Sequence, residues 1–170
     1  MSVTYTNVDA TTVSLSRVTD KYTEYLTFNR ADPAFLPTRE ERKFSDDARG
    51  PELAETAIKE GPAFPLVAGT EFHLKGIRTV TGDRASTAQA VITEIDRTCS
   101  VGPPEQLSVA AGDFQIMKVE CTTEQAGGKG TVEYDYAPQL GVNVRIMHRR
   151  PLGDGPREVM TVLELRDYPH

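Results

Sequence analysis

The chain has 170 residues, of which 38% are hydrophobic and 26% are charged, and its formal net charge at pH 7 is −6. This size favours a single domain over residues 1–170, and the acidic excess disfavours nucleic acid as a partner because few cations are left to neutralise phosphates. No apolar run approaches the roughly 20 residues of a membrane span and no signal peptide or lipid anchor is recognised, so the chain is not expected to span a membrane.

The N-terminal half is expected to start with an extended arm over residues 1–12 and to continue as three strands. Apolar and polar residues alternate in "TTVSLSRV" (11–18) and in "YTEYLTFNR" (22–30), and "EERKF" (40–44) follows two prolines. Alternation with a period of two predicts strands with one buried face.

Residues 51–60, "PELAETAIKE", are the one segment predicted to be a helix. Four apolar residues fall on one stripe at helical spacing: Leu53, Ala54, Ala57 and Ile58. Pro51 suits the first turn of a helix, and Gly61-Pro62 ends it. We therefore expect one short helix that covers part of a sheet.

The C-terminal half is dominated by alternation with a period of two, which predicts a meander of antiparallel strands. Strand patterns occur in "FPLVAGTEFHLKGIRTV" (64–80), "STAQAVITEIDRTCSV" (86–101), "TVEYDYAP" (131–138), "VNVRIMHR" (142–149) and "VMTVLELRDY" (159–168). Turn residues separate the last three. The chain as a whole is predicted to be mainly β, with about eight to ten strands in a curled antiparallel sheet or open barrel and the one short helix.

The segment "EQLSVAAGDFQIMKVECTTE" (105–124) is predicted to be a hairpin with its turn at residues 110–113. This turn places Val109 opposite Phe114. Continued without a break, the same register places Cys99 opposite Glu124.

The segment "GPP" (102–104) interrupts that register, because proline lacks an N–H donor and glycine marks bulges. If these three residues loop out, the register shifts by three and Cys99 lies opposite Cys121. We then expect a disulfide between the two cysteines, provided that their side chains share a face. Two free, buried thiols in a cytosolic protein are the alternative.

A set of motifs surrounds this hairpin: Cys99-Ser100-Val101, Glu105, "AAGDF" (110–114) and Cys121, with "FPLVAG" (64–69) before them and "YAPQLG" (136–141) after them. The pattern resembles a family of proteobacterial periplasmic and lipoprotein β-domains of unknown function. In that family a Cys-x-Val and a Glu precede a Val-Pro-Ala-Gly-x-Phe turn and a second cysteine. Here Ala110 replaces the usual proline. The family usually has a tryptophan soon after the Phe-Pro-Leu element, where this chain has Phe72.

The resemblance covers about residues 62–150 and implies a curled sheet, broadly like the open half-barrels of periplasmic lipoprotein carriers. It also implies a periplasmic or cell-envelope location, and it agrees with the Cys99–Cys121 disulfide. None of its motifs is catalytic, and it implies no substrate.

No pattern indicates a catalytic residue, a cofactor or a metal site, since the histidines lack metal-ligand spacing and Cys-x-x-Cys is absent. One inner face on two neighbouring strands suggests a different chemistry, and its residues are Tyr134, Tyr136, Val144, Ile146 and His148. Tyrosine has an apolar body and a polar tip, so this face suits either a filled core or the wall of a cavity for a lipophilic ligand.

The sequence therefore predicts a non-enzymatic extracytoplasmic domain of a Gram-negative bacterium. It would either bind a lipophilic small molecule or act as an accessory subunit with an envelope protein as partner. An open cavity behind Tyr134 and Tyr136 favours the carrier, and a filled core favours the structural subunit. The alternative is a hydrolase-type enzyme in which Glu133 or Asp135 acts with His148.

Overall fold

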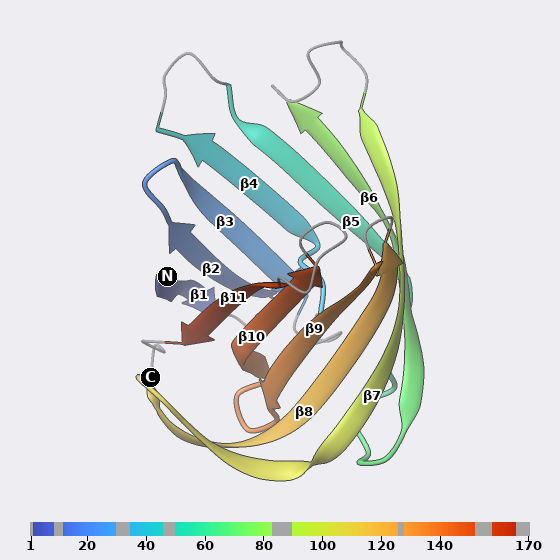
Figure 1. Ribbon diagram of the computed structural model, residues 1–170. Coiled ribbons are helices and arrows are strands. Elements are labelled where there is room, and N and C mark those ends of the chain that lie inside the picture. The colour runs from blue at the N-terminus through green and yellow to red at the C-terminus, as the bar shows by residue number, and fades with distance from the viewer. Residues whose placement is uncertain are drawn as a thin grey trace.

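The computed structural model describes residues 2–8, 12–29, 35–45, 50–82, 90–125, 128–151 and 158–165, which form a closed β-barrel (Figure 1). The strands are β1 (Ser2–Val8), β2 (Thr12–Val18), β3 (Tyr22–Asn29), β4 (Arg39–Phe44), β5 (Glu52–Glu60), β6 (Glu71–Gly82), β7 (Val91–Val109), β8 (Gly112–Gln125), β9 (Gly128–Ala137), β10 (Val142–Pro151) and β11 (Glu158–Leu165). The predicted mainly β, curled antiparallel sheet is confirmed. The described residues contain no helix, and so none that could cross a membrane.

The sheet closes because of its first and last strands. Ser2–Val8, expected to belong to an extended arm, instead form β1. β1 is antiparallel to β2, and it pairs with β11 in parallel at Ser2 and Val3. The described residues therefore form eleven strands, one more than the upper number expected, and the sheet is closed.

The predicted helix over residues 51–60 is wrong, because this segment forms β5 between β4 and β6. Alternate residues of β5 face inward, and Glu52, Ala54 and Thr56 are buried there. Leu53 and Ala54, which a helix would place on one stripe, lie on opposite faces of the sheet. A helix of about ten residues is marginal by itself, whereas two neighbouring strands satisfy the backbone hydrogen bonds of β5.

The predicted β7–β8 hairpin is confirmed, but its turn is tighter than expected. Val109 pairs with Gly112, so two residues make the turn, and Leu107 instead of Val109 lies opposite Phe114. Gly112 has a φ of 135°, a conformation that other residues rarely adopt. Glycine therefore suits this end of the turn.

A bulge of one residue changes the register between Val101 and Pro104, where the sequence predicted a loop of three residues. Cys99 nevertheless lies opposite Cys121, because the tighter turn compensates for the smaller bulge. The predicted disulfide is confirmed, with a Cα–Cα distance of 4.0 Å and both cysteines buried. Disulfides are typical of oxidising compartments outside the cytoplasm.

Two clusters of buried side chains fill the interior. In Figure 1 the tip of the β7–β8 hairpin curves beneath one end of the barrel. There Leu107, Val109 and Phe114 pack against the first cluster, which is Val13, Leu15, Leu26, Ile116, Ala137, Val142 and Val144. The second cluster contains the disulfide with Phe35, Leu36, Leu74, Val101, Met117, Val119, Val132, Tyr134 and Tyr136.

At the end opposite the hairpin tip, β6 and β7 continue beyond β8. Val91 already pairs with Val80 of β6, whereas the β7–β8 ladder begins only at Thr98 and Thr122. Beyond this pair, Thr123 Oγ1 of β8 still donates a hydrogen bond to the Asp96 carbonyl of β7 at 3.1 Å, but no further ladder pairs of β7 and β8 follow among the described residues. We call this the open end of the barrel.

The double substitution Cys99→Ala with Cys121→Ala is expected to destabilise the barrel. The cysteines are 22 residues apart, so freeing the unfolded chain should lower the free energy of unfolding by about 3 kcal/mol. Urea unfolding without reductant measures this. Quantitative thiol labelling of the denatured wild-type protein without reductant would contradict the disulfide.

Candidate functional site

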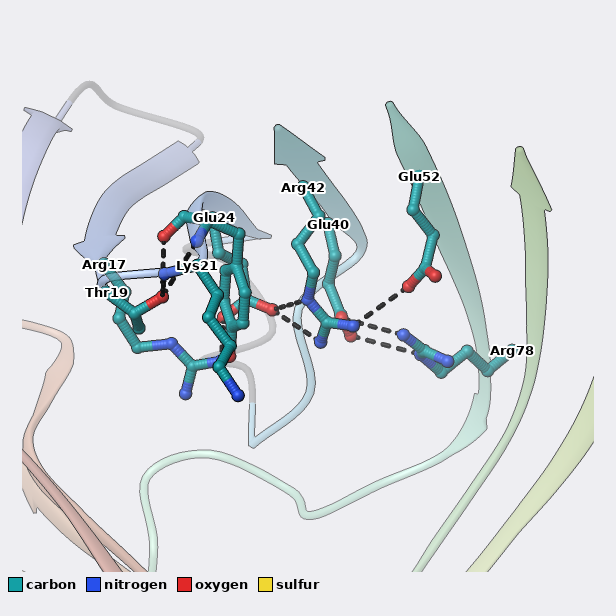
Figure 2. A network of polar contacts seen from close by, with 9 residues as sticks. Arg17, Thr19, Lys21, Glu24, Glu40, Arg42, Glu52 and Arg78 are labelled. Atoms are coloured by element: carbon teal, nitrogen blue, oxygen red, sulfur yellow. Dashed lines mark hydrogen bonds and ion pairs between the residues drawn. The ribbon is translucent and has the colours of Figure 1, made fainter. Parts of the chain in front are cut away.

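A row of charged side chains crosses the inner face of β2–β5 (Figure 2). Arg17 lies opposite Glu24, Glu24 lies opposite Arg42, and Arg42 lies opposite Glu52. Opposed residues of antiparallel strands point to the same face, so the register alternates the charges. Arg17 pairs with Glu24, and Arg42 donates from Nε to Glu24 Oε1 at 2.7 Å and from Nη1 to Glu52 Oε1 at 3.0 Å.

A second ion pair extends the row from β4 to β6. Arg78 donates from Nε and Nη2 to the two carboxylate oxygens of Glu40, at 3.2 and 2.9 Å. Ala54, the β5 residue opposite Glu40, has a small side chain that leaves space for this contact. We call the six residues the charged row: Arg17, Glu24, Glu40, Arg42, Glu52 and Arg78.

Two of the three carboxylates of the charged row, those of Glu24 and Glu52, lie deeper than its arginines. The side chains of Glu24 and Glu52 are 2% and 4% exposed, whereas those of the three arginines are 14–26% exposed. A buried charge without a partner is strongly destabilising. The arginines therefore neutralise the carboxylates and also separate them from solvent.

Tyr22 positions the two arginines nearest the β2–β3 turn. The guanidinium carbons of Arg17 and Arg42 lie 5.7 and 5.2 Å from the centroid of its ring, within the range of a cation–π interaction. Arg17 Nη2 also donates to the Tyr22 hydroxyl at 3.2 Å. Thr19 holds the turn itself, because its Oγ1 accepts hydrogen bonds from the backbone N–H groups of Lys21 and Tyr22.

The pKa of Arg42 is raised above its ordinary value. Burial by itself lowers this pKa, but the carboxylates of Glu24, Glu52 and Glu40 outweigh it. Arg42 therefore stays charged wherever the protein is folded. It acts as a fixed electrostatic link between strands and not as an acid or a base.

The charged row was not predicted from the sequence, although the sequence contains a signal for it. Arg17 has the same strand parity as Leu15, and Glu24 has the same parity as Leu26. Both charges thus occupy positions on the face that the alternation assigns to the core. Charges at such positions indicate paired groups or a site.

Four of the five residues of the predicted ligand wall belong to or pack against the two clusters, and His148 belongs to neither. Tyr134 and Tyr136 belong to the cluster around the disulfide, and Ile146, opposite Tyr134, packs against both clusters. Val144 belongs to the cluster at the hairpin tip, because a bulge interrupts β10 beside it. His148 lies two residues beyond Ile146 on β10, on the same inner face.

Aromatic rings from two connections occupy the space beside Tyr134 and Tyr136. Phe35, which precedes β4, is buried with its ring centroid 4.9 Å from that of Tyr134 and 6.4 Å from that of Tyr136. The ring centroid of Phe64, which precedes β6, lies 5.8 Å from that of Tyr136. Phe35 lies in a segment without a periodic pattern, and Phe64 was expected to begin a strand, whereas β6 starts at Glu71. The sequence therefore did not predict the place of either ring. They give the middle of the barrel a packed aromatic core.

Glu133 and Asp135, the carboxylates of the enzyme alternative, do not share a face with His148. Both alternate with the inward residues of β9 and therefore point outward. Asp135 is buried and accepts a hydrogen bond from Arg145 Nε at 2.6 Å, and Glu133 lies 3.8 Å from Lys118 Nζ. General acid–base chemistry needs its groups within reach of one substrate, and this arrangement separates them.

Arg97 and Tyr134 form a further contact, from β7 to β9 across the inner face of β8. Arg97 Nη1 donates a hydrogen bond to the Tyr134 hydroxyl at 2.7 Å. Burial raises the pKa of Tyr134, although Arg97 acts in the opposite direction. The phenol is therefore neutral at neutral pH, and it does not offset the charge of Arg97.

No protein-family model, curated protein or solved structure matches this chain. The chemistry of the interior is therefore inferred from its geometry.

Glu24→Gln is expected to destabilise the barrel by about 3–5 kcal/mol, because it leaves Arg17 and Arg42 without their shared counter-charge. Chemical denaturation measures the free energy of unfolding. Glu55→Gln is the matched control: this carboxylate pairs with Arg39 and is 67% exposed, so its loss should change stability by no more than about 0.5 kcal/mol. Equal effects of the two variants would contradict a stabilising role for the charged row.

Tyr134→Phe is expected to reduce the loss of stability at alkaline pH. The pKa of Tyr134 in the folded protein lies above the ordinary value of 10.0, so above that pH the folded state holds a proton that the unfolded state has released. The stability from the neutral phenol is complete below pH 10 and is lost as the pH rises. Unfolding measured between about pH 8 and 11 tests this, with Tyr25→Phe as an exposed control. An unchanged slope in Tyr134→Phe would refute the assignment.

Proposed function

We propose that this chain is a non-enzymatic β-barrel domain that works outside the cytoplasm as an accessory or structural subunit of a bacterial envelope assembly. One observation carries the proposal: the protein's own aromatic side chains occupy the inner face that a lipophilic ligand would use. Phe35 is the central residue of this filling, since it lies against both Tyr134 and Tyr136.

The side chains along the whole length of the interior favour a structural subunit over a carrier. The β7–β8 hairpin tip packs one end, and Phe35 and Phe64 pack the middle. Toward the open end the inner face bears the ion pairs of the charged row. Sites for lipophilic ligands are mostly apolar hollows. A large apolar ligand would have to displace Phe35 or desolvate paired charges.

The cysteines support the proposed compartment. The Cys99–Cys121 disulfide is buried, and disulfides persist in oxidising surroundings such as the periplasm. The resemblance of the motifs around these cysteines to periplasmic and lipoprotein domains favours the bacterial envelope in particular.

The fluorescent apolar probe N-phenyl-1-naphthylamine tests the filled core. The wild-type protein is expected to leave its fluorescence unchanged, whereas Phe35→Ala should bind it and lose about 3–5 kcal/mol of stability, because a cavity forms beside Tyr134 and Tyr136. Phe44→Ala is the matched control, since Phe44 packs on Tyr22 away from this cluster. Stoichiometric binding of the probe by the wild-type protein would support a carrier instead.

Native mass spectrometry of the protein isolated from its own cell envelope, without reductant, tests the subunit role directly. We expect a discrete assembly with other chains at a fixed stoichiometry. A bound mass of the size of a lipid, without partner chains, would instead support the carrier. A bare monomer would contradict both.

A further inference from the structure

Arg97 is the one arginine on the described inner face of β2–β7 that has no carboxylate partner. The three glutamates of the charged row are already held by Arg17, Arg42 and Arg78. Arg97 contacts only the hydroxyl of Tyr134 among the described residues. Four arginines thus face three glutamates on this wall, and one positive charge is left without a counter-charge.

That charge cannot be removed by titration. A guanidinium stays protonated in proteins, and the Tyr134 phenol that it contacts is neutral at neutral pH. Arg97 is half-buried, and a charge that is withdrawn from water without a counter-ion is costly. An anion from solution that reached Arg97 would therefore gain a favourable contact.

The remaining donors of Arg97 have a geometry that suits a carboxylate. Nη1 is used by Tyr134, while Nε and Nη2 have no partner among the described residues. These two N–H groups lie side by side and match the two oxygens of a carboxylate. Arg97 immediately precedes the first residue of the β7–β8 ladder, and its side chain is only half-buried, so part of it is in contact with solvent.

The neighbours of Arg97 on the inner face indicate which chemical group a ligand would carry next to its carboxylate. Leu74 lies opposite it on β6, and Ile95 and Cys99 are the adjacent inward residues of β7. These neighbours are apolar, which favours an apolar body next to the charged group. One unbalanced positive charge favours a singly charged ligand over a phosphate dianion.

We propose that Arg97 binds the carboxylate of a small, apolar monocarboxylic acid at the open end of the barrel. This site is additional to the subunit role, because it uses neither the cavity of a lipophilic carrier nor a protein partner. Benzoate is a suitable probe, since its ring is apolar and its single carboxylate fits the Nε/Nη2 pair.

Isothermal titration calorimetry of the full chain with benzoate tests the proposal, with benzamide and inorganic phosphate as comparisons. We expect saturable binding of benzoate and weaker or no binding of the other two. Arg97→Gln should weaken benzoate binding by about tenfold or more, since it removes a charge-assisted pair. Arg39→Gln, which removes the same charge from the outer face, should leave it unchanged.

Three results would overturn the site: no binding of benzoate by the wild-type protein, equal affinity in Arg97→Gln, or tighter binding of phosphate than of benzoate. If Arg97→Gln fails to fold, Arg97→Lys keeps the charge and loses the two-pronged geometry, so it should bind benzoate more weakly than the wild type. Equal affinity in Arg97→Lys would also overturn the assignment. The naphthylamine experiment reports on the filled core alone, so its outcome is separate from this one.

Discussion

The carboxylate of Glu24 is the contact on which the N-terminal half of this barrel depends. It forms ion pairs with Arg17 on β2 and with Arg42 on β4, and so links three neighbouring strands. A slip of one residue in β3 would turn Glu24 outward, which would leave Arg17 inside without its carboxylate and Arg42 with Glu52 alone. β4 carries only one apolar side chain, Phe44, so hydrophobic alternation cannot set its register. The ion pairs therefore specify the pairing where apolar patterning is weakest.

The opposite half is specified by apolar packing and by one covalent bond. The bulge after Val101 lets the tip of the β7–β8 hairpin fold across the end of the barrel, where it meets the first cluster. The disulfide fixes the strands just beyond that bulge. Phe35 then packs against the aromatic residues of the second cluster. Apolar packing and the disulfide thus hold this half of the barrel together, whereas ion pairs hold the other.

The strands β9 and β10 could be predicted from the sequence because their inward residues are mostly apolar and their outward residues are mostly polar. The same rule failed for β5, where Glu52 faces inward and Leu53 faces outward, so the segment resembles a helix more than a strand. The pairing of the cysteines was predicted correctly because two errors cancel: the turn is tighter than expected, and the bulge before Pro104 is smaller than expected. Phe35 and Arg97 were not identified. Their roles depend on which strands and connections meet in space, and alternation along one segment contains no such information.

The seam between β1 and β11 has a consequence for how the barrel is made. Ser2 pairs with Glu164 and Val3 pairs with Leu165, so these contacts join opposite ends of the described chain. Loop closure over such a span is entropically costly and slow, whereas every other strand pairs with its neighbour in sequence. An open, curled sheet can therefore form progressively during synthesis or export, and the ring closes only after β11 has emerged. Until then β1 has an unpaired backbone edge, which gives chaperones a defined stage at which to act.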